Sequence, residues 1–80
     1  MQWTREDERV YRLVKSLIRE TRVTLTHLRF GKIEFERSGE RFIRRDVLSD
    51  GREVIEKDVP SEAVEVVMFQ AIKEGWKVCR

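Results

Sequence analysis

The sequence predicts a small α+β domain, in the order α-β-β-β-α, with two helices packed on one face of a three-stranded antiparallel meander. Two observations carry this prediction. Apolar residues recur at helical spacing near both ends of the chain, and the middle alternates between apolar and polar residues around two glycine-containing turns. Strands grouped between helices are typical of an antiparallel sheet with its helices on one side. The 80 residues are expected to form a single compact domain, 1–80.

The first helix is predicted over about residues 5–21. Thr4 suits the N-cap position, and acidic residues follow it in the first turn, where the helix dipole favours negative charge. Trp3, just before the cap, is expected to fold back onto the apolar stripe of this helix. That stripe consists of Val10, Leu13, Val14, Leu17 and Ile18, with Tyr11 on its flank.

The three strands of the meander are predicted over residues 32–37, 41–48 and 53–59. Residues 32–37 alternate strictly, with Ile33 and Phe35 on the face expected to be buried, and Ile43 of the next strand is also expected in the core. A turn at residues 38–40 and the Asp-Gly pair at residues 50–51 separate the strands. Residues 23–30 fit either a further strand or a linker.

The second helix is predicted over about residues 62–74. Pro60 ends the sheet, Ser61 is a candidate cap, and Gly75 suits the position just after the helix with Trp76 packing back. Residues 76–80 are short and have room for one edge strand. The apolar stripe of this helix consists of Val64, Val67, Met68, Ala71 and Ile72.

The composition argues against a disulfide-stabilised protein and against a membrane-spanning one. The single cysteine excludes an internal disulfide framework, and no apolar run approaches the roughly 18 residues of a membrane span. The charged N-terminus does not resemble a secretion signal, so we expect a cytoplasmic protein without membrane contact. Charged residues make up 40% of the chain and asparagine is absent, a bias found in thermophilic proteins.

Catalytic and metal chemistry find little support in the sequence. His27 and Cys79 are the only histidine and the only cysteine, and neither lies in a motif that pairs a nucleophile with a base. One histidine and one cysteine do not make a zinc site. We therefore expect no enzyme, no metal and no cofactor, and the roles of His27 and Cys79 stay open.

The second helix carries a second apolar surface. Val66 and Phe69 lie almost opposite its main stripe, near Glu62 and Lys73. Exposed apolar groups of this kind mark interfaces, although the first helix could cover them instead. These four residues form the predicted partner interface. The expected function is a non-enzymatic protein-binding regulator or accessory module, self-associating as a homodimer that buries Val66 and Phe69.

The alternative function is nucleic-acid binding through an arginine-rich surface. Twelve of the seventeen basic residues are arginines, a side chain suited to phosphate contacts. The net charge of only +2 weighs against it. The candidate contacts to nucleic acid or to an acidic partner are Arg5, Arg9, Arg12, Lys15, Arg19, Arg22, Arg41, Arg44 and Arg45.

Overall fold

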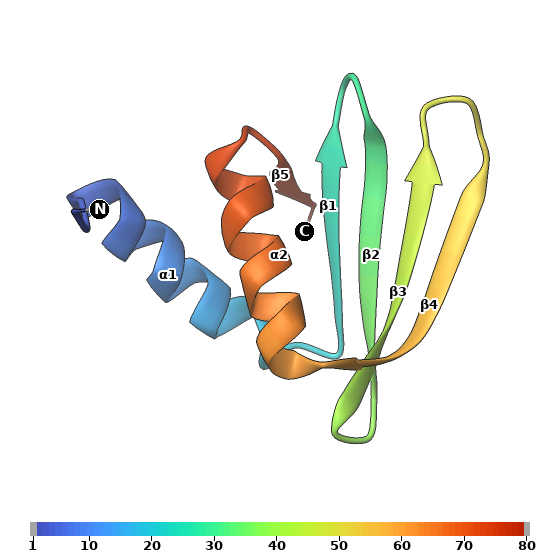
Figure 1. Cartoon of the computed structure of the whole chain (residues 1–80), viewed down its shortest axis with the longest axis horizontal. Coiled ribbons are helices and arrows are strands. Elements are labelled where there is room, and N and C mark those ends of the chain that lie inside the picture. The colour runs from blue at the N-terminus through green and yellow to red at the C-terminus, as the bar shows by residue number, and fades with distance from the viewer. Residues whose placement is uncertain (1, 80) are drawn as a thin grey trace.

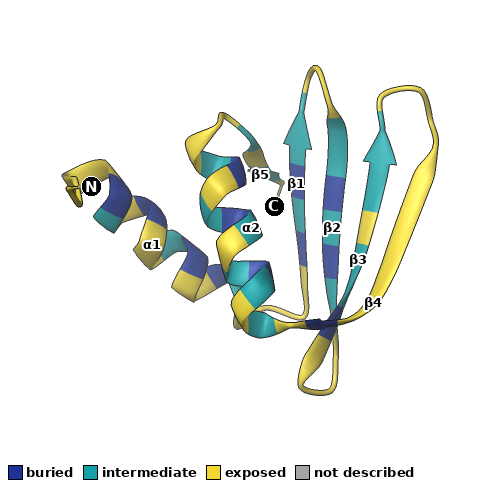
Figure 2. Cartoon of the chain, in the orientation of Figure 1, coloured by how far each residue is buried: buried dark blue, intermediate teal, exposed yellow. Residues whose placement is uncertain are grey.

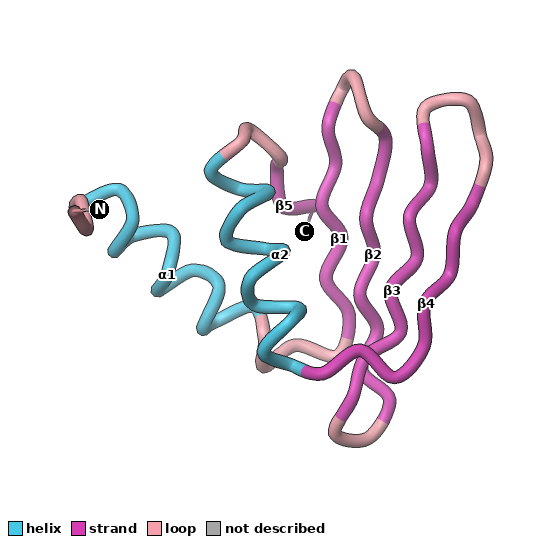
Figure 3. Tube along the Cα trace, viewed as in Figure 1, coloured by secondary structure: helices cyan, strands magenta, loops and turns pink. Residues whose placement is uncertain are grey.

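The computed structural model describes residues 2–79 and contains two helices and one five-stranded sheet (Figure 1). The loops between the elements are short (Figure 3). All neighbouring strands are antiparallel. The elements are α1 (Arg5–Leu17), β1 (Arg22–His27), β2 (Gly31–Ser38), β3 (Arg41–Leu48), β4 (Glu53–Pro60), α2 (Ser61–Lys73) and β5 (Lys77–Cys79).

The prediction of an α+β domain with two helices is confirmed, but the prediction of three strands is wrong. The sheet has the order β4-β3-β2-β1-β5. The segment left open at residues 23–30 supplies β1, because Val23 and Leu25 alternate with threonines and pair with Phe35 and Ile33 of β2. The C-terminal residues supply β5, which pairs only with β1. Strand β1 forms a hairpin with the neighbouring β2, whereas β5 has only three residues and its partner β1 is far away in sequence.

The chain reaches the two edges of the sheet in different ways. Strands β1 to β4 follow one another as hairpins, so that β4 lies at one edge. Helix α2 then crosses back and delivers β5 to the opposite edge, beside β1 (Figure 1). The helices lie on the β5–β1 side of the molecule, whereas β4 is exposed along nearly its whole length (Figure 2).

Both predicted helices form, with shifted ends. Helix α1 ends at Leu17 instead of near residue 21, and α2 covers residues 61–73. The Thr4 cap is confirmed as a capping box: the Asp7 N–H donates to Thr4 Oγ1 at 3.1 Å, and the Thr4 N–H donates to Asp7 Oδ2 at 3.0 Å. At the start of α2, Pro60 occupies the N-cap position, and no side chain caps the helix. Ser61 is therefore the first helical residue and not the cap.

Helix α2 ends as predicted. Gly75 adopts φ +102°, and its N–H donates to the Ile72 carbonyl at 3.2 Å. The Trp76 N–H donates to the Ala71 carbonyl at 2.9 Å. These two bonds form a Schellman motif, which requires a residue in the left-handed region and so favours glycine.

The core lies between the helices and one face of the sheet. Most of the predicted core residues are buried, while Leu13, Ile43, Val67 and Ile72 are half-buried. Ile43 is less buried than expected because it faces Glu36 on the side of the sheet away from the helices. The buried apolar residues are Val10, Val14, Leu17, Val23, Leu25, Ile33, Phe35, Phe42, Val59, Val64, Met68 and Ala71.

Neither helix within residues 2–79 has both the length and the apolar composition that a membrane crossing requires.

Candidate functional site

A groove of about 540 Å³ runs between the outward sides of α1 and α2. The two helices supply opposite walls, and Trp3 enters from the segment just before α1. Its lining contains three aromatic side chains and two glutamates. The lining residues are Trp3, Tyr11, Val14, Glu62, Glu65, Val66, Phe69 and Gln70.

Trp3 links the two helices across one end of this groove. Its ring stacks on Phe69 of α2, with centroids 5.7 Å apart and an interplanar angle of 17°. It also meets Tyr11 of α1 edge to face at 6.0 Å. The indole N–H donates to Glu8 Oε2 at 2.9 Å, which helps to hold the pKa of Glu8 below its usual value. The sequence predicted that Trp3 folds back onto α1, whereas its stacking partner is on α2.

Three of the four residues of the predicted partner interface line the groove: Glu62, Val66 and Phe69. The valine side chain is 55% exposed, whereas the phenylalanine is half-buried beneath Trp3. The sequence left open whether an interface or the first helix covers these two residues. Phe69 already has an intramolecular neighbour, and Val66 keeps an open surface.

Lys73, the fourth predicted interface residue, lies beside the groove and joins the two helices. Its ammonium group donates to Asp7 Oδ1, and Asp7 is the one buried charged residue among those described. This hydrogen bond, together with those from Thr4, lowers the pKa of Asp7, and the same bond raises the pKa of Lys73. The ion pair therefore fastens the C-terminal end of α2 to the first turn of α1.

The charged residues in the lining of the groove are acidic, and the ammonium groups of Lys15 and Lys73 lie over its Tyr11 and Phe69 rings. Glu62 and Glu65 are the only charged residues in its lining, and Glu62 has no ion pair among residues 2–79. Glu65 accepts a hydrogen bond from Lys15 of α1 at 2.9 Å, which raises the pKa of Lys15. The sequence did not identify Trp3, Tyr11, Glu65 or Gln70 as part of this surface. Tyr11 on the flank of the apolar stripe was the nearest signal.

The arginine-rich surface is divided in the structure. Residues Arg5, Arg9 and Arg12 lie together on α1 around Glu8, which pairs with Arg12 at 3.1 Å. Arg44 and Arg45 are neighbours on β3 and so point to opposite faces of the sheet. Binding of nucleic acid through these groups stays a prediction.

Several of the predicted basic contacts already pair with a carboxylate. The remaining predicted contacts, among the described residues, have no ion pair. The paired ones are Arg12 with Glu8, Lys15 with Glu65, Arg22 with Glu36 and Arg44 with Asp46; the others are Arg5, Arg9, Arg19, Arg41 and Arg45.

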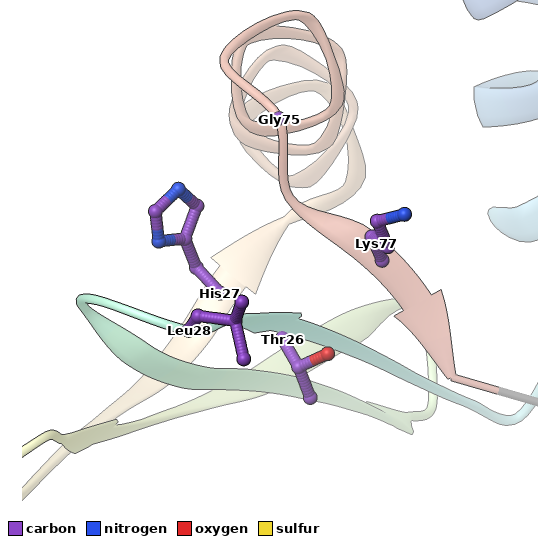
Figure 4. A pocket seen from close by; sticks show the side chains of 5 residues that line it. All are labelled: Thr26, His27, Leu28, Gly75 and Lys77. Carbon is purple, nitrogen blue, oxygen red and sulfur yellow. The ribbon is translucent and has the colours of Figure 1, made fainter.

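His27 lies in a second, smaller hollow at the end of β1. Its ring contacts Phe30 and Trp76, with centroids 4.7 Å and 5.4 Å away, and its Nδ1 accepts the Arg29 N–H at 3.1 Å. Figure 4 shows this hollow of about 350 Å³, lined by Thr26, His27, Leu28, Gly75 and Lys77. Thr26 and His27 point to opposite sides of the strand (Figure 4).

Cys79 does not approach His27. Its Sγ lies 3.7 Å from Thr26 Oγ1, and it pairs with Thr24, so it belongs to the face opposite the imidazole. A thiol–imidazole dyad is therefore ruled out by the strand register. In the described part of the chain, no three His, Cys, Asp or Glu side chains gather closely enough to hold a metal ion.

Comparisons with protein-family models, with curated proteins and with solved structures gave no match.

Proposed function

We propose that this chain is a non-enzymatic protein-binding module that receives an amphipathic helix of another protein in the groove between α1 and α2. The observation that carries the proposal is the apolar groove itself, in which Trp3 stacks on Phe69 and Val66 remains exposed. Apolar grooves between helices bind partner helices through large apolar anchors at helical spacing. Tryptophan and tyrosine are also the residues most enriched at binding hot spots.

The charge of the groove defines the chemistry of the partner. Its two charged lining residues are glutamates, and only Glu65 has an internal cation nearby. A helix with lysine or arginine beside its apolar stripe would complement Glu62 and gain in rate and specificity of association. An acidic helix of the same apolar composition would be repelled.

The experiment uses two synthetic helical peptides with the same leucine stripe, one flanked by lysines and the other by glutamates. Binding is followed by the indole N–H signal of Trp3 in ¹⁵N NMR spectra, with the Trp76 signal as an internal reference. We expect the lysine peptide to shift the Trp3 signal and to bind at least about tenfold more tightly than the glutamate peptide, a difference of about 1.4 kcal/mol.

Two variants of the chain give a matched control. Val66 and Val54 are exposed to the same extent, 55% and 56%, but Val54 lies on β4. Val66→Glu should abolish the shift at Trp3, and Val54→Glu should leave it unchanged. Equal binding of both peptides, or an equal effect of both variants, would contradict the proposal.

The homodimer that the sequence predicts through Val66 and Phe69 is an alternative occupant of this groove. Light scattering on Phe69→Glu tests it directly. A parent dimer that becomes a monomer in this variant would assign the groove to a second copy of the chain, and the proposal of a foreign helix would fail.

A further inference from the structure

Strand β4 is an open edge of the sheet, on the far side of the molecule from α1 (Figure 1). Only its Val59 is buried. Soluble proteins protect such edges, since unpaired backbone groups there can pair with another chain. One end of β4 has this protection: a bulge lies opposite Phe42 and Arg44, Asp58 adopts φ +57°, and Pro60 follows.

The other end of β4 lacks this protection. Residues 53–56 pair with β3 in regular register, and the consecutive apolar residues Val54 and Ile55 are 56% and 51% exposed. Two adjacent residues on a strand point to opposite faces, so each face of the sheet carries one exposed apolar side chain at this edge. The segment from Glu53 to Glu56 is therefore a straight, partly apolar edge, and Lys57 follows it at the start of the bulge.

The register shows which backbone groups are free. The Leu48 N–H donates to the Arg52 carbonyl at 2.8 Å, which makes residues 48 and 52 a hydrogen-bonded pair. Hydrogen-bonded and non-bonded pairs alternate along an antiparallel ladder, so Val54 and Glu56 also bond to β3. The backbone groups of Glu53 and Ile55 therefore point away from β3 and are available to another strand.

The charges select one register for a second copy of the same strand. When two copies of a strand pair antiparallel about a two-fold axis, the residue at the axis faces the same residue of the second copy. An axis at Glu53, Glu56 or Lys57 brings like charges together. An axis at Val54 places Glu53 opposite Ile55 and Glu56 opposite Arg52. The Arg52 side chain already donates to Asp50 Oδ2 at 2.6 Å, so it is not free to pair with Glu56.

An axis at Ile55 pairs the free backbone groups of Ile55 with those of its copy and brings no like charges together. Ile55 then faces Ile55 of the second copy, and each Glu53 faces Lys57 of the other chain. Opposite charges and β-branched residues directly across a strand pair are both stabilising. All of these side chains lie on the sheet face away from the helices, since Ile55 pairs with Arg45 on that face.

We propose that two copies of this chain associate through β4, antiparallel and centred on Ile55, to form one continuous sheet. This surface is separate from the groove between α1 and α2, so the inference does not depend on the proposed function. Five paired residues a side bury less than the roughly 1,200 Å² of a standard interface, so the dimer is weak and depends on concentration.

Sedimentation equilibrium over a range of protein concentrations tests the proposal by charge reversal and rescue. Glu53→Lys places two like-charged pairs in the interface and should weaken dimerisation by about tenfold or more. The double variant Glu53→Lys with Lys57→Glu restores both pairs in the exchanged sense and should recover the parent dissociation constant. Glu56→Lys makes the same change of charge next to these positions, but it faces Val54 of the second copy and should have little effect.

The outcomes separate this surface from other modes of association. Glu53, Glu56 and Lys57 are exposed, so variants at these positions should fold, and circular dichroism checks this for every variant, including Phe69→Glu. The proposal is overturned by a parent that stays monomeric at all concentrations, by a charge reversal that the double variant does not rescue, or by a dimer that Phe69→Glu dissociates and Glu53→Lys does not.

Discussion

The two sides of this molecule are stabilised differently. Ten of the twelve buried apolar side chains belong to α1, α2, β1 and β2, and the other two, Phe42 and Val59, face each other near the junction of β4 and α2. Beyond that pair, the β3–β4 hairpin is stabilised by backbone pairing of β3 with β2, and its β4 side chains are exposed. Hydrophobic burial therefore organises the helical side, and hydrogen bonding organises the hairpin. The two proposed binding surfaces divide in the same way, with an apolar groove on one side and an open strand edge on the other.

The largest expected effect separates the two sides by a core substitution. Leu17 is completely buried, so Leu17→Ala should lower the free energy of unfolding by about 2–5 kcal/mol. Ile55→Ala on the hairpin should change it by no more than about 0.5 kcal/mol at concentrations where the chain is monomeric. Urea unfolding followed by circular dichroism measures both. Similar losses in the two variants would show that the hairpin shares the core.

A second substitution tests the connection between the two sides. Gly31 adopts φ +110°, and a Cβ there would lie 2.1 Å from the Val47 carbonyl oxygen of β3. Gly31→Ala should therefore cost about 2–4 kcal/mol through backbone strain and displacement of β3 from β2.

Gly39 provides the control for this substitution, since it also has a positive φ, +65°, but open space around it. Gly39→Ala should cost only the strain of the left-handed conformation, about 1–2 kcal/mol. Urea unfolding compares the two variants, and hydrogen exchange in Gly31→Ala should show the fastest exchange in β3 and β4. A larger loss for Gly39→Ala would mean that the contact with Val47 is not the cause.

The smallest expected effect is a pH dependence confined to the helical side. The pKa of Asp7 is lowered from its ordinary value of 3.8, chiefly by the hydrogen bond from Lys73. A group with a lowered folded pKa stabilises the protein above its unfolded pKa, and this contribution disappears as the pH falls through the folded value. The melting temperature should therefore fall below about pH 4, and Asp7→Asn should make that fall shallower.

Lys73→Met provides an independent check, because it removes the main cause of the lowered pKa and should likewise flatten the acid response. Thermal melts between neutral pH and pH 2 measure all three proteins. A slope equally steep in the parent and in both variants would show that this ion pair does not contribute to the acid sensitivity.

Much of the fold could be predicted from local patterns. The cap at Thr4, the Schellman end at Gly75 and the alternation of Ile33 and Phe35 each depend on neighbours within a few residues. The two strands that the three-stranded prediction did not include, β1 and β5, have weaker local signals. Only two alternating apolar residues, Val23 and Leu25, indicate β1, whereas β5 is too short to carry a periodicity and pairs with β1 far away in sequence.

The candidate site also has one part that the sequence predicts and another that depends on tertiary packing. The sequence alone determined that Val66 and Phe69 lie off the main stripe of α2, because helical spacing places side chains around an axis without any knowledge of the neighbours. Only the tertiary structure decided that Trp3 stacks on Phe69 and that Arg44, and not Arg45, lies on the sheet face that the helices cover. These outcomes depend on the crossing of α1 and α2 and on the strand register, which arise from the packing of all the elements together.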